Sequence, residues 1–361
     1  MKIKFLDLHE QYLSIKENID KTIFDVINDS AFIGGSSIEA FQEKFKNYQD
    51  VNYFLGVGNG TDALEIAIEA LDLPKRSEII VPANSFISSA EAVSRMGFRA
   101  VFCDVNPDDY TINIEDLKKR INKNTSAIVA VHLYGHPCQM RSLLNLADEY
   151  SLKIIEDCAQ AHGAEFEGKK VGGIGHIGCW SFYPGKNLGA YGDAGGISTN
   201  DENLFLKCKK IANHGRLSKY NHEFEGRNSR LDNLQAAILN VKLDYLEEWT
   251  DHRIIVADEY ISCLKDINEL TLPKTSSSVK HVFHLFVVRT SNREAIKSKL
   301  LDAGVETGIH YPIALPKLKA FNYLDQANEK GFAWVSDKEL LSLPIHGNFK
   351  LTNIKYIREN L

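Results

Sequence analysis

Residues 181–193 read SFYPGKNLGAYGD, and the one lysine of this stretch, Lys186, stands among aromatic, proline and glycine residues. A lysine on a protein surface has a pKa of about 10.4, so it is protonated and unreactive at neutral pH. Apolar surroundings disfavour the ammonium form, and a lysine whose pKa is lowered in this way can form a Schiff base with a carbonyl. Taken alone, a lysine in a glycine-rich loop is more often structural than catalytic.

An acidic residue upstream changes that balance. Residues 153–163 read KIIEDCAQAHG, and the apolar run predicts a buried strand that ends at Asp157. Open α/β sheets bind their ligands at the carboxyl ends of their strands. A carboxylate there can keep the ring nitrogen of pyridoxal phosphate (PLP) protonated, so that the ring withdraws electrons. Helix capping is an equally good interpretation of Asp157 alone, and Lys186 tips the choice towards a PLP site.

A third segment has the pattern of an anion site. Residues 53–71 read YFLGVGNGTDALEIAIEAL, which predicts a strand, a glycine-rich turn and a helix. Backbone N–H groups at such a helix start bind phosphate, and Thr61 adds a hydroxyl. The glycines also resemble half of a dinucleotide fingerprint, but no carboxylate follows the next strand, 78–82, to hold a ribose hydroxyl.

Length, composition and charge limit the class of protein. A chain of 361 residues with 44% hydrophobic residues is long enough for two domains with their own cores. The net charge of −6 and the absence of a basic tract argue against nucleic acid or an anionic membrane as partner. The N-terminus has no signal-peptide pattern and no long apolar run occurs, so we expect a cytoplasmic protein. Six scattered cysteines and twelve histidines show no disulfide or metal spacing, so we predict reduced thiols and no metal.

Strands and helices alternate along most of the chain. The expected strands lie at 78–81, 99–103, 127–131, 153–157, 174–182 and 195–199. The helices between them are expected at 88–96, 114–121 and 140–150. This βαβ series predicts an α/β fold with a mostly parallel sheet and helices on both faces.

The last third has a different pattern. A long helical stretch at 232–264 is followed by a strand at 282–288, a helix at 292–303 and an extended segment at 305–311. We therefore predict a large domain at 1–245, with an N-terminal arm at about 1–12, and a smaller α+β domain at 246–361.

Six motifs in order carry a resemblance to a known family. They are NGTDAL at 59–64, EDCAQAHG at 156–163, the lysine segment 181–193, NHG at 213–215, NSRLD with LQAA at 228–237, and IHYP at 309–312. Together they resemble the DegT/DnrJ/EryC1/StrS family of PLP-dependent sugar aminotransferases. The resemblance spans nearly the whole chain and implies fold-type I, the fold of aspartate aminotransferase.

The resemblance implies roles for residues around the cofactor ring. Lys186 matches the lysine that binds PLP covalently, and Asp157 matches the acid that pairs with the pyridine nitrogen. Gln160 matches a residue near the ring hydroxyl. Phe86 matches an aromatic that stacks on the ring face, although without the motif a core position is the better interpretation of this phenylalanine.

Further residues are implied at the cofactor phosphate. Gly60 and Thr61 match the phosphate-binding turn, and Ser181 matches a hydroxyl that reaches the same phosphate. Asn228 matches a residue that the neighbouring subunit contributes, so the resemblance implies an obligate homodimer with shared active sites. Asn228 read by itself is an ordinary polar loop residue.

Histidines are less informative. We expect His162, His214, His222 and His310, each taken singly, to be structural. His310 and Tyr311 follow an expected strand, however, so we predict that they approach the substrate.

The resemblance implies transfer of an amino group from glutamate to a nucleotide-linked ketosugar. Residues 5–8 (FLDL) and 281–287 (HVFHLFV) look more like members that aminate carbon 3 than carbon 4. The expected substrate is a dTDP- or UDP-linked 3-keto sugar, often a 6-deoxyhexose, and the product would serve surface polysaccharide (lipopolysaccharide O-antigen) or glycan synthesis. A 4-ketosugar aminotransferase is the main alternative.

Three other classes stay open. A PLP-dependent sugar dehydratase of this fold has histidine where this chain has Lys186, so the lysine argues against it. A nicotinamide oxidoreductase is supported by residues 56–60 alone. A non-catalytic ligand-binding module would bind PLP without transferring an amino group.

Overall fold

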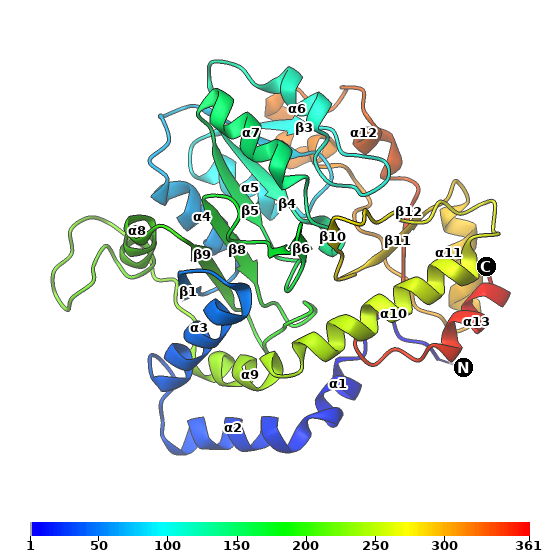
Figure 1. Cartoon of the computed structure of the whole chain (residues 1–361), viewed down its shortest axis with the longest axis horizontal. Helices are drawn as coiled ribbons and strands as arrows, with labels where there is room; N and C mark the ends of the chain where they lie inside the picture. Colours follow the sequence, from blue (N-terminus) through cyan, green and yellow to red (C-terminus); the bar gives the residue numbers. More distant parts are fainter. Residues whose placement is uncertain (1) are drawn as a thin grey trace.

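A seven-stranded sheet forms the centre of the molecule. The structure is a computed structural model that describes residues 2–361. The strand order is β1-β9-β8-β5-β4-β2-β3 (Figure 1). The strands are β1 (Tyr53–Val57), β2 (Glu78–Pro82), β3 (Arg99–Cys103), β4 (Thr125–Val131), β5 (Lys153–Asp157), β8 (Ile177–Ser181) and β9 (Gly195–Thr199). β9 is antiparallel to both of its neighbours, and the pairings among β3, β2, β4, β5 and β8 are parallel. The predicted mostly parallel α/β sheet is confirmed.

Helices cover both faces of this sheet. α4 (Gly60–Ala70), α5 (Ser88–Arg95) and α8 (Glu202–Ala212) share one apolar cluster with it, and α6 (Ile114–Arg120) and α7 (Met140–Tyr150) share another. Ile79 and Val81 of β2 belong to the first cluster and Ile80 to the second. Successive side chains of a strand point to opposite faces, so a strand buried on both faces is apolar throughout.

The N-terminal helices are α1 (Leu8–Ser14), α2 (Lys16–Asn28) and α3 (Ser36–Gln49). α3 packs against the antiparallel edge strand β1, and α2 packs against α9 (Asn233–Leu243). Phe41 and Phe45 of α3 contact the rings of Phe54 and Phe182, with centroid separations of 4.7–6.0 Å. Leu239 of α9 joins the same cluster.

The helical stretch predicted at 232–264 is two helices. α9 ends at Leu243 and α10 (Leu246–Leu264) leaves it in a new direction (Figure 1). The amides of Asp244 and Tyr245 bond to the carbonyls of Val241 and Lys242, three residues back, at 3.3 and 3.1 Å. These tighter bonds end α9, and periodicity alone does not reveal the break.

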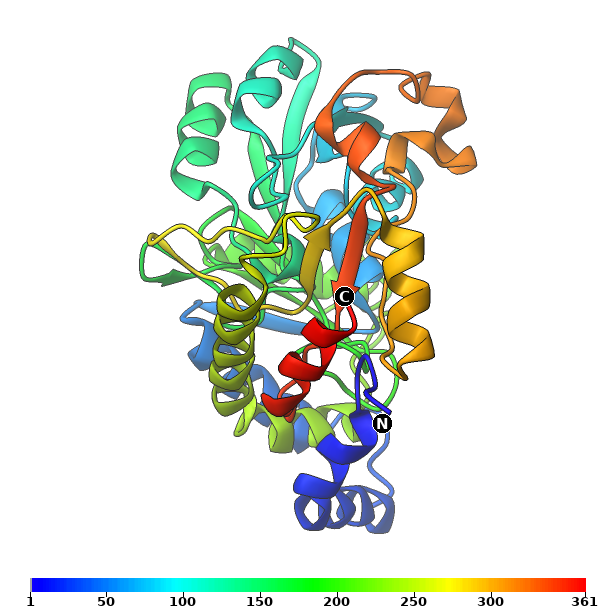
Figure 2. The same ribbon diagram turned by 90° about the vertical axis from the view of Figure 1, so that its right-hand side faces the viewer.

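A second, two-stranded sheet lies in the C-terminal third. β11 (Phe286–Arg289) pairs antiparallel with β12 (Leu340–Leu343), and α10, α11 (Arg293–Asp302) and α13 (Thr352–Glu359) enclose it (Figure 2). The strand predicted at 282–288 begins only at Phe286. The amides of Val282 and Leu285 instead bond to the carbonyls of Gly135 and Tyr134 at 3.1 and 3.3 Å, so a tertiary contact overrides the strand pattern.

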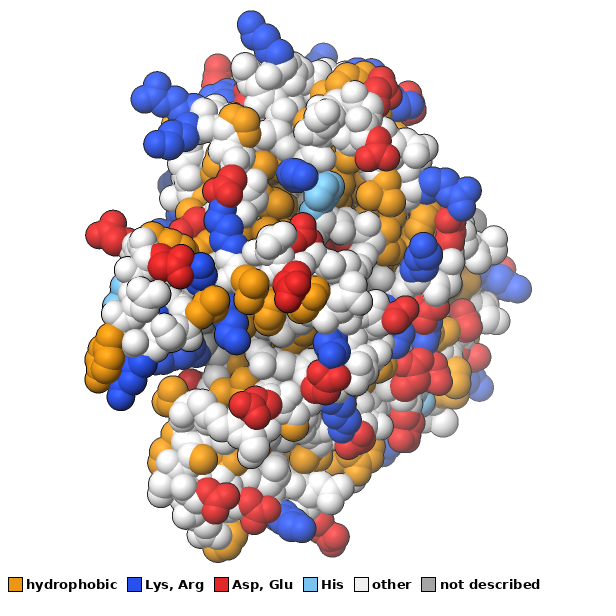
Figure 3. Space-filling view, turned by 60° about the vertical axis from the view of Figure 1, so that its left-hand side comes forward, with side chains coloured by type: hydrophobic (Ala, Val, Ile, Leu, Met, Phe, Trp, Pro, Cys, Tyr) orange, Lys and Arg blue, Asp and Glu red, His pale blue; other side chains and the backbone are white. Residues whose placement is uncertain are grey.

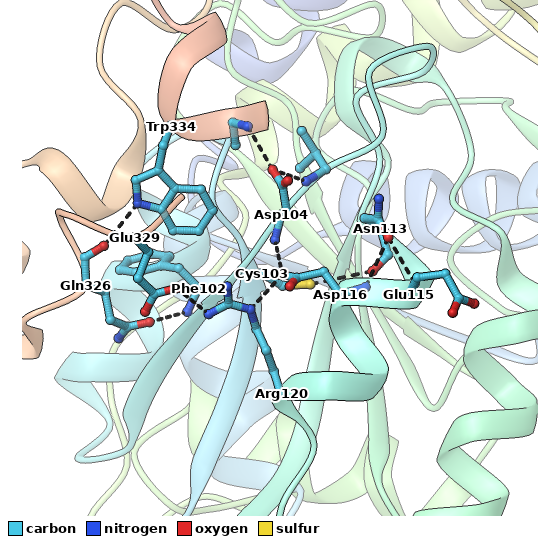
Figure 4. Close-up of polar contacts among 12 residues, drawn as sticks. Phe102, Cys103, Asp104, Asn113, Glu115, Asp116, Arg120, Gln326, Glu329 and Trp334 are labelled. Atoms are coloured by element: carbon cyan, nitrogen blue, oxygen red, sulfur yellow. Dashed lines mark hydrogen bonds and ion pairs between the residues drawn. The ribbon is translucent and has the colours of Figure 1, made fainter. Parts of the chain in front are cut away.

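Another part of the C-terminal third attaches to the edge of the large sheet (Figure 4). The side chain of Gln326 accepts from Phe102 N at 2.8 Å and donates to Ala100 O at 3.0 Å, which pairs the open edge of β3. Trp334 of α12 (Phe332–Ser336) is buried in the large core and donates to Gln326 O at 3.0 Å. The proposed domain boundary near residue 245 therefore stays a prediction.

The remaining elements are short. They are η1 (Leu133–Gly135), η2 (Leu315–Lys317), η3 (Lys319–Leu324) and the small strands β6 (Glu165–Phe166), β7 (Lys169–Lys170) and β10 (Val279–Lys280). No helix within residues 2–361 has both the length and the apolar character needed to cross a membrane. Within the described residues 2–361, all six cysteines are free thiols, and five of them are buried.

Candidate active site

Three chain segments meet at the carboxyl edge of the parallel strands. Asp157 is the last residue of β5, and Ser181 is the last residue of the neighbouring β8. The start of α4 lies directly beside them, because a Cβ placed on Gly60 would stand 2.7 Å from the Cβ of Ser181. The fold thus brings together the acid, the lysine loop and the glycine-rich turn that the sequence analysis singled out.

The turn before α4 is built to hold an anion. Asn59 caps the helix by accepting from Asp62 N at 2.8 Å, which leaves the first amides of α4 directed outward. The hydroxyls of Thr61 and Ser88 lie 2.8 Å apart. A dinucleotide site would place this turn after a central parallel strand, but β1 is an antiparallel edge strand, so that alternative does not fit the topology.

Lys186 lies in the loop that follows β8. Burial lowers the pKa of its amine to about 8, and the negative charge of Asp157 acts in the opposite direction. The next residue fixes the loop, because Asn187 donates to Val282 O at 3.2 Å and its amide oxygen lies 3.0 Å from His284 Nδ1. Lys186 and Asp157 therefore share one site, as the sequence analysis required.

Neutral imidazoles surround this lysine. Burial, together with the nearby Lys186, lowers the pKa of His162 to about 3 and that of His310 to about 4. The same causes, with further cationic neighbours, lower the pKa of His284 well below its ordinary value. These rings therefore add no positive charge beside Lys186 at neutral pH. His162 packs against Trp180 and Phe182, as expected of a structural histidine.

Asp157 is held on both carboxylate oxygens. It is only 6% exposed, and it accepts from Ser89 Oγ at 2.7 Å and from Ala159 N at 3.2 Å. Residues 158–163 form turns and no helix starts there, so the capping interpretation of Asp157 is wrong. A buried acid in this position needs a cationic partner in the site.

A polar network joins Gln160 to the C-terminal segment. The side-chain amide oxygen of Gln160 accepts from Tyr134 N at 2.6 Å, and its amide nitrogen donates to Tyr311 Oη at 3.0 Å. Tyr134 Oη donates in turn to His310 O, and His310 Nδ1 lies 2.8 Å from Ser342 Oγ. His310 and Tyr311, predicted to approach a substrate, thus lie in the same hydrogen-bond network as Gln160.

Phe86 is not a core residue. Its side chain is 54% exposed, and its ring lies 5.8 Å from that of Tyr311. The core interpretation is therefore wrong, and the exposed ring is free to stack on a ligand.

Asn228 is the one predicted site residue that the single chain leaves apart. It is exposed and forms an isolated β-bridge with Asn213, and the contacts that join the cluster within residues 2–361 do not involve it. Its predicted role, in the site of a neighbouring subunit, stays a prediction.

Several supporting residues were missed in the sequence. Ser89 donates to Asp157 and is itself in contact with Ser85, and Tyr134 takes a positive φ of 59° that aims its amide at Gln160. No local pattern marks these residues, because each acts across a long sequence separation.

Glu156 and His132 form a second buried network next to Asp157. The carboxylate of Glu156 lies 3.0 Å from His132 Nε2 and accepts from three amides of residues 172–175. Cys158 brings a third ligand-type atom close to this pair. Both oxygens of Glu156 already have hydrogen-bond partners, so we interpret Glu156 and His132 as a structural pair that stabilises the turn at residues 172–175.

The arrangement fits one kind of cofactor. A low-pKa lysine stands between an acid and an anion-binding turn, with an exposed aromatic ring nearby, and the absence of space for a Cβ at Gly60 keeps the turn close to Ser181. PLP carries an aldehyde, a ring nitrogen and a phosphate that match these three groups. The fold and the site define a PLP-dependent enzyme.

Comparison with known proteins identifies the family. The model of the DegT/DnrJ/EryC1/StrS aminotransferase family matches residues 13–361, and the chain belongs to this family. The protein is an aminotransferase, and its cofactor is PLP.

Relatives and a solved structure resemble the chain over almost its full length. One is dTDP-3-amino-3,6-dideoxy-alpha-D-galactopyranose transaminase of Aneurinibacillus thermoaerophilus, 42% identical over 95% of this chain and 94% of the relative. Another is UDP-2-acetamido-2-deoxy-3-oxo-D-glucuronate aminotransferase of Pseudomonas aeruginosa, 37% identical over 98% of both chains. The crystal structure of S. venezuelae DesV in complex with a ketimine intermediate superposes with a TM-score of 0.95 at 36% identity, over 99% of this chain and 98% of that one.

Proposed function

We propose that this enzyme transfers the amino group of L-glutamate to carbon 3 of a dTDP- or UDP-linked 3-keto sugar, often a 6-deoxyhexose. The observation that carries the proposal is the common position of Lys186 and Asp157 in a chain of the aminotransferase family. The names of the relatives support the sugar, since they specify dTDP-3-amino and UDP-3-oxo compounds. The product would serve the synthesis of surface polysaccharide, including lipopolysaccharide O-antigen, or of another glycan.

Lys186 is the catalytic residue in this proposal. PLP supplies an aldehyde that binds amines covalently and a ring that withdraws electrons from the carbon being deprotonated. Lys186 Nζ would be the amine that holds the cofactor covalently. Its pKa of about 8 leaves a useful fraction of the amine neutral near pH 7, so Lys186 Nζ could accept the α-proton of the amino donor as a general base. The same amine runs this proton transfer in reverse on the ketosugar, which predicts ping-pong kinetics.

The other predicted residues bind and orient the cofactor. Asp157 would pair with the ring nitrogen and favour its protonated form, and Gln160 would bond near the ring hydroxyl. Phe86 would stack on the ring face. Gly60, Thr61 and Ser181 hold the phosphate at the start of α4, where the helix dipole favours an anion. His310 and Tyr311 line the substrate side.

A homodimer completes the site. Asn228 is proposed to reach the cofactor phosphate of the neighbouring subunit, and its exposed segment projects from the body of the chain (Figure 1). Large apolar side chains are exposed on this segment and on the N-terminal helices, and one face of the molecule mixes such side chains with charged ones (Figure 3). They are Phe24, Ile27, Phe32, Ile33, Leu217, Tyr220 and Phe224. Large apolar side chains exposed in this way are available to a protein interface, which supports the proposed dimer.

Mixed dimers test the shared site. Subunits with Lys186→Ala are unfolded and refolded together with subunits with Asn228→Ala, each inactive or weakly active alone. Random pairing gives half mixed dimers, each with one intact site, so activity should rise to about a quarter of the wild-type value. Activity that stays at the sum of the two parents would show that each chain uses its own Asn228.

A substrate panel tests the reaction. The purified protein with PLP is incubated with L-glutamate and with 3-keto or 4-keto sugars linked to dTDP or UDP, and the amino sugar is measured by mass spectrometry. We expect amination of 3-keto sugars, loss of reaction in Lys186→Ala and a strong reduction in Asp157→Asn. Preferential amination of 4-keto sugars would overturn the assignment of carbon 3. Release of water without amine transfer would favour a dehydratase.

A further inference from the structure

The first turn of α5 contacts two of the proposed cofactor-binding residues, Thr61 and Asp157. Ser88 contacts the hydroxyl of Thr61 on the phosphate side, and Phe86 exposes its ring just before the helix. Ser89 reaches Asp157 on the opposite side, with its Oγ 2.7 Å from Asp157 Oδ2. This turn therefore links the phosphate side of the site, at Thr61, to the opposite side, at Asp157.

A second serine stands behind Ser89. Ser85 Oγ lies 2.7 Å from Ser89 Oγ, and both serines are almost completely buried, at 3% and 1% exposure. The three groups thus form a line from Ser85 through Ser89 to Asp157, away from bulk water. Buried hydroxyls in such a line polarise one another.

The direction of the protons in this line follows from the chemistry of the groups. An ionised carboxylate only accepts hydrogen bonds, so the single hydroxyl proton of Ser89 is donated to Asp157. The contact between the two hydroxyls then requires Ser85 to be the donor and Ser89 the acceptor. Ser85 therefore acts on Asp157 only through Ser89.

We propose that Ser85 and Ser89 form a two-hydroxyl relay that orients the carboxylate of Asp157 and supplies it with a donor hydrogen bond, so that the proton shared with the pyridine nitrogen of PLP would stay on the nitrogen. The inference rests on the proposed function, in which Asp157 faces that nitrogen. A donor hydrogen bond stabilises the charged form of a carboxylate. Without it the carboxylate becomes a stronger base and draws the shared proton away from the ring. Both serines are positioning residues in this scheme.

Two properties of the cofactor report on the relay. The first is the dissociation constant of PLP from the apoprotein, measured by fluorescence. The second is the ¹⁵N NMR signal of ring-labelled PLP bound to the protein, which reports whether the nitrogen carries a proton. The variants are Ser89→Ala, Ser85→Ala, the double variant and Asp157→Asn. The control is Ser94→Ala on the same helix, where the hydroxyl bonds to Ala90 O and Tyr323 Oη.

We expect Ser89→Ala to weaken PLP binding roughly tenfold, the usual effect of losing a hydrogen bond to a charged group. The ring ¹⁵N signal should move towards the unprotonated position. Ser85→Ala should have the same effects at a smaller size, about threefold in binding. The double variant should equal Ser89→Ala, because Ser85 has no other path to Asp157. Ser94→Ala should match the wild type, and Ser89→Thr, which keeps the hydroxyl, should restore the protonated signal.

Each contrary outcome has one meaning. If Ser89→Ala or Ser85→Ala lowers the thermal stability of the apoprotein but leaves the ¹⁵N signal unchanged, the serines only pack the helix and the relay is refuted. Additive effects in the double variant would also refute it. If Ser89→Ala has no effect while Asp157→Asn changes both properties, the relay fails and the proposed site stands. If Asp157→Asn changes neither, the proposed function itself fails.

Discussion

The lowered pKa of Lys186 makes a quantitative prediction about how fast the apoprotein captures its cofactor. Burial lowers the pKa of this amine to about 8, against an ordinary value near 10.5. Only the neutral amine attacks the aldehyde of PLP. At pH 7 the neutral fraction is about 10% for a pKa of 8 and about 0.03% for a pKa of 10.5. The protein environment therefore speeds capture by roughly 300-fold at this pH.

The perturbation is pH and the assay is stopped-flow absorbance. Apoprotein is mixed with PLP between pH 6 and pH 10.5, and the rate of covalent attachment is compared with that of a free alkylamine. The rate for the protein should rise about tenfold per pH unit below pH 8 and become flat above it. The rate for the free amine should keep rising to about pH 10.

The outcome that would refute this reasoning is a protein rate that rises without a break through pH 10. Such a profile would mean that the amine of Lys186 is hydrated like a surface lysine. Lys186→Ala provides the blank for binding without attachment, and Lys123→Met, at an exposed position, provides the variant that should leave the profile unchanged.

Three further variants separate binding from folding. Gly60→Ala should weaken PLP binding at least tenfold in a titration of the apoprotein, because its Cβ would stand 2.7 Å from that of Ser181; wild-type affinity would contradict the close approach. Phe86→Ala should weaken PLP binding while changing the unfolding free energy of the apoprotein by less than about 0.5 kcal/mol, since the side chain is 54% exposed; an apoprotein that loses several kcal/mol in denaturant would return Phe86 to the core. Trp334→Ala should lower the unfolding free energy by about 3–5 kcal/mol in urea, because the indole is buried against the large sheet; an unchanged midpoint would show that this segment does not support the fold.

Much of the fold could be predicted from local pattern. The alternation of short apolar strands with amphipathic helices predicted the parallel sheet and its two helical layers, because residues such as Ile79 and Ile80 are apolar on both faces of one strand. The break between α9 and α10 and the late start of β11 could not be predicted, because contacts of Val282 and Leu285 with residues 134 and 135 decide the second of these.

The site residues also divide into those that the sequence predicted and those that it could not. Lys186, Asp157 and Thr61 stand in segments whose local composition is already informative, so the sequence revealed them. Ser89 contacts Asp157 across 68 positions, and nothing near either residue marks the pair. Composition alone favoured a core position for Phe86, since an aromatic residue is usually buried; only the resemblance to the family predicted an exposed, ligand-stacking ring.

The chain has a second buried lysine, Lys242, so the choice of the cofactor-binding lysine needs an argument. Burial lowers the pKa of Lys242 to about 7, below that of Lys186, so a lowered pKa by itself does not single out the catalytic amine. The two differ in their surroundings. Lys242 Nζ donates to Gly189 O at 2.7 Å and lies 4.2 Å from the ring centre of Tyr191, whereas the charge of Asp157 acts on Lys186. These different surroundings favour Lys186 over Lys242 as the lysine that binds the cofactor, in line with the proposal.

Borohydride reduction of the enzyme with bound PLP, followed by peptide mapping, tests this assignment most directly. Reduction makes the link between the cofactor and its lysine permanent, so mass spectrometry locates it. We predict the added mass on Lys186, within the peptide that contains residues 181–193. A label on Lys242, or on any lysine outside that segment, would contradict the account.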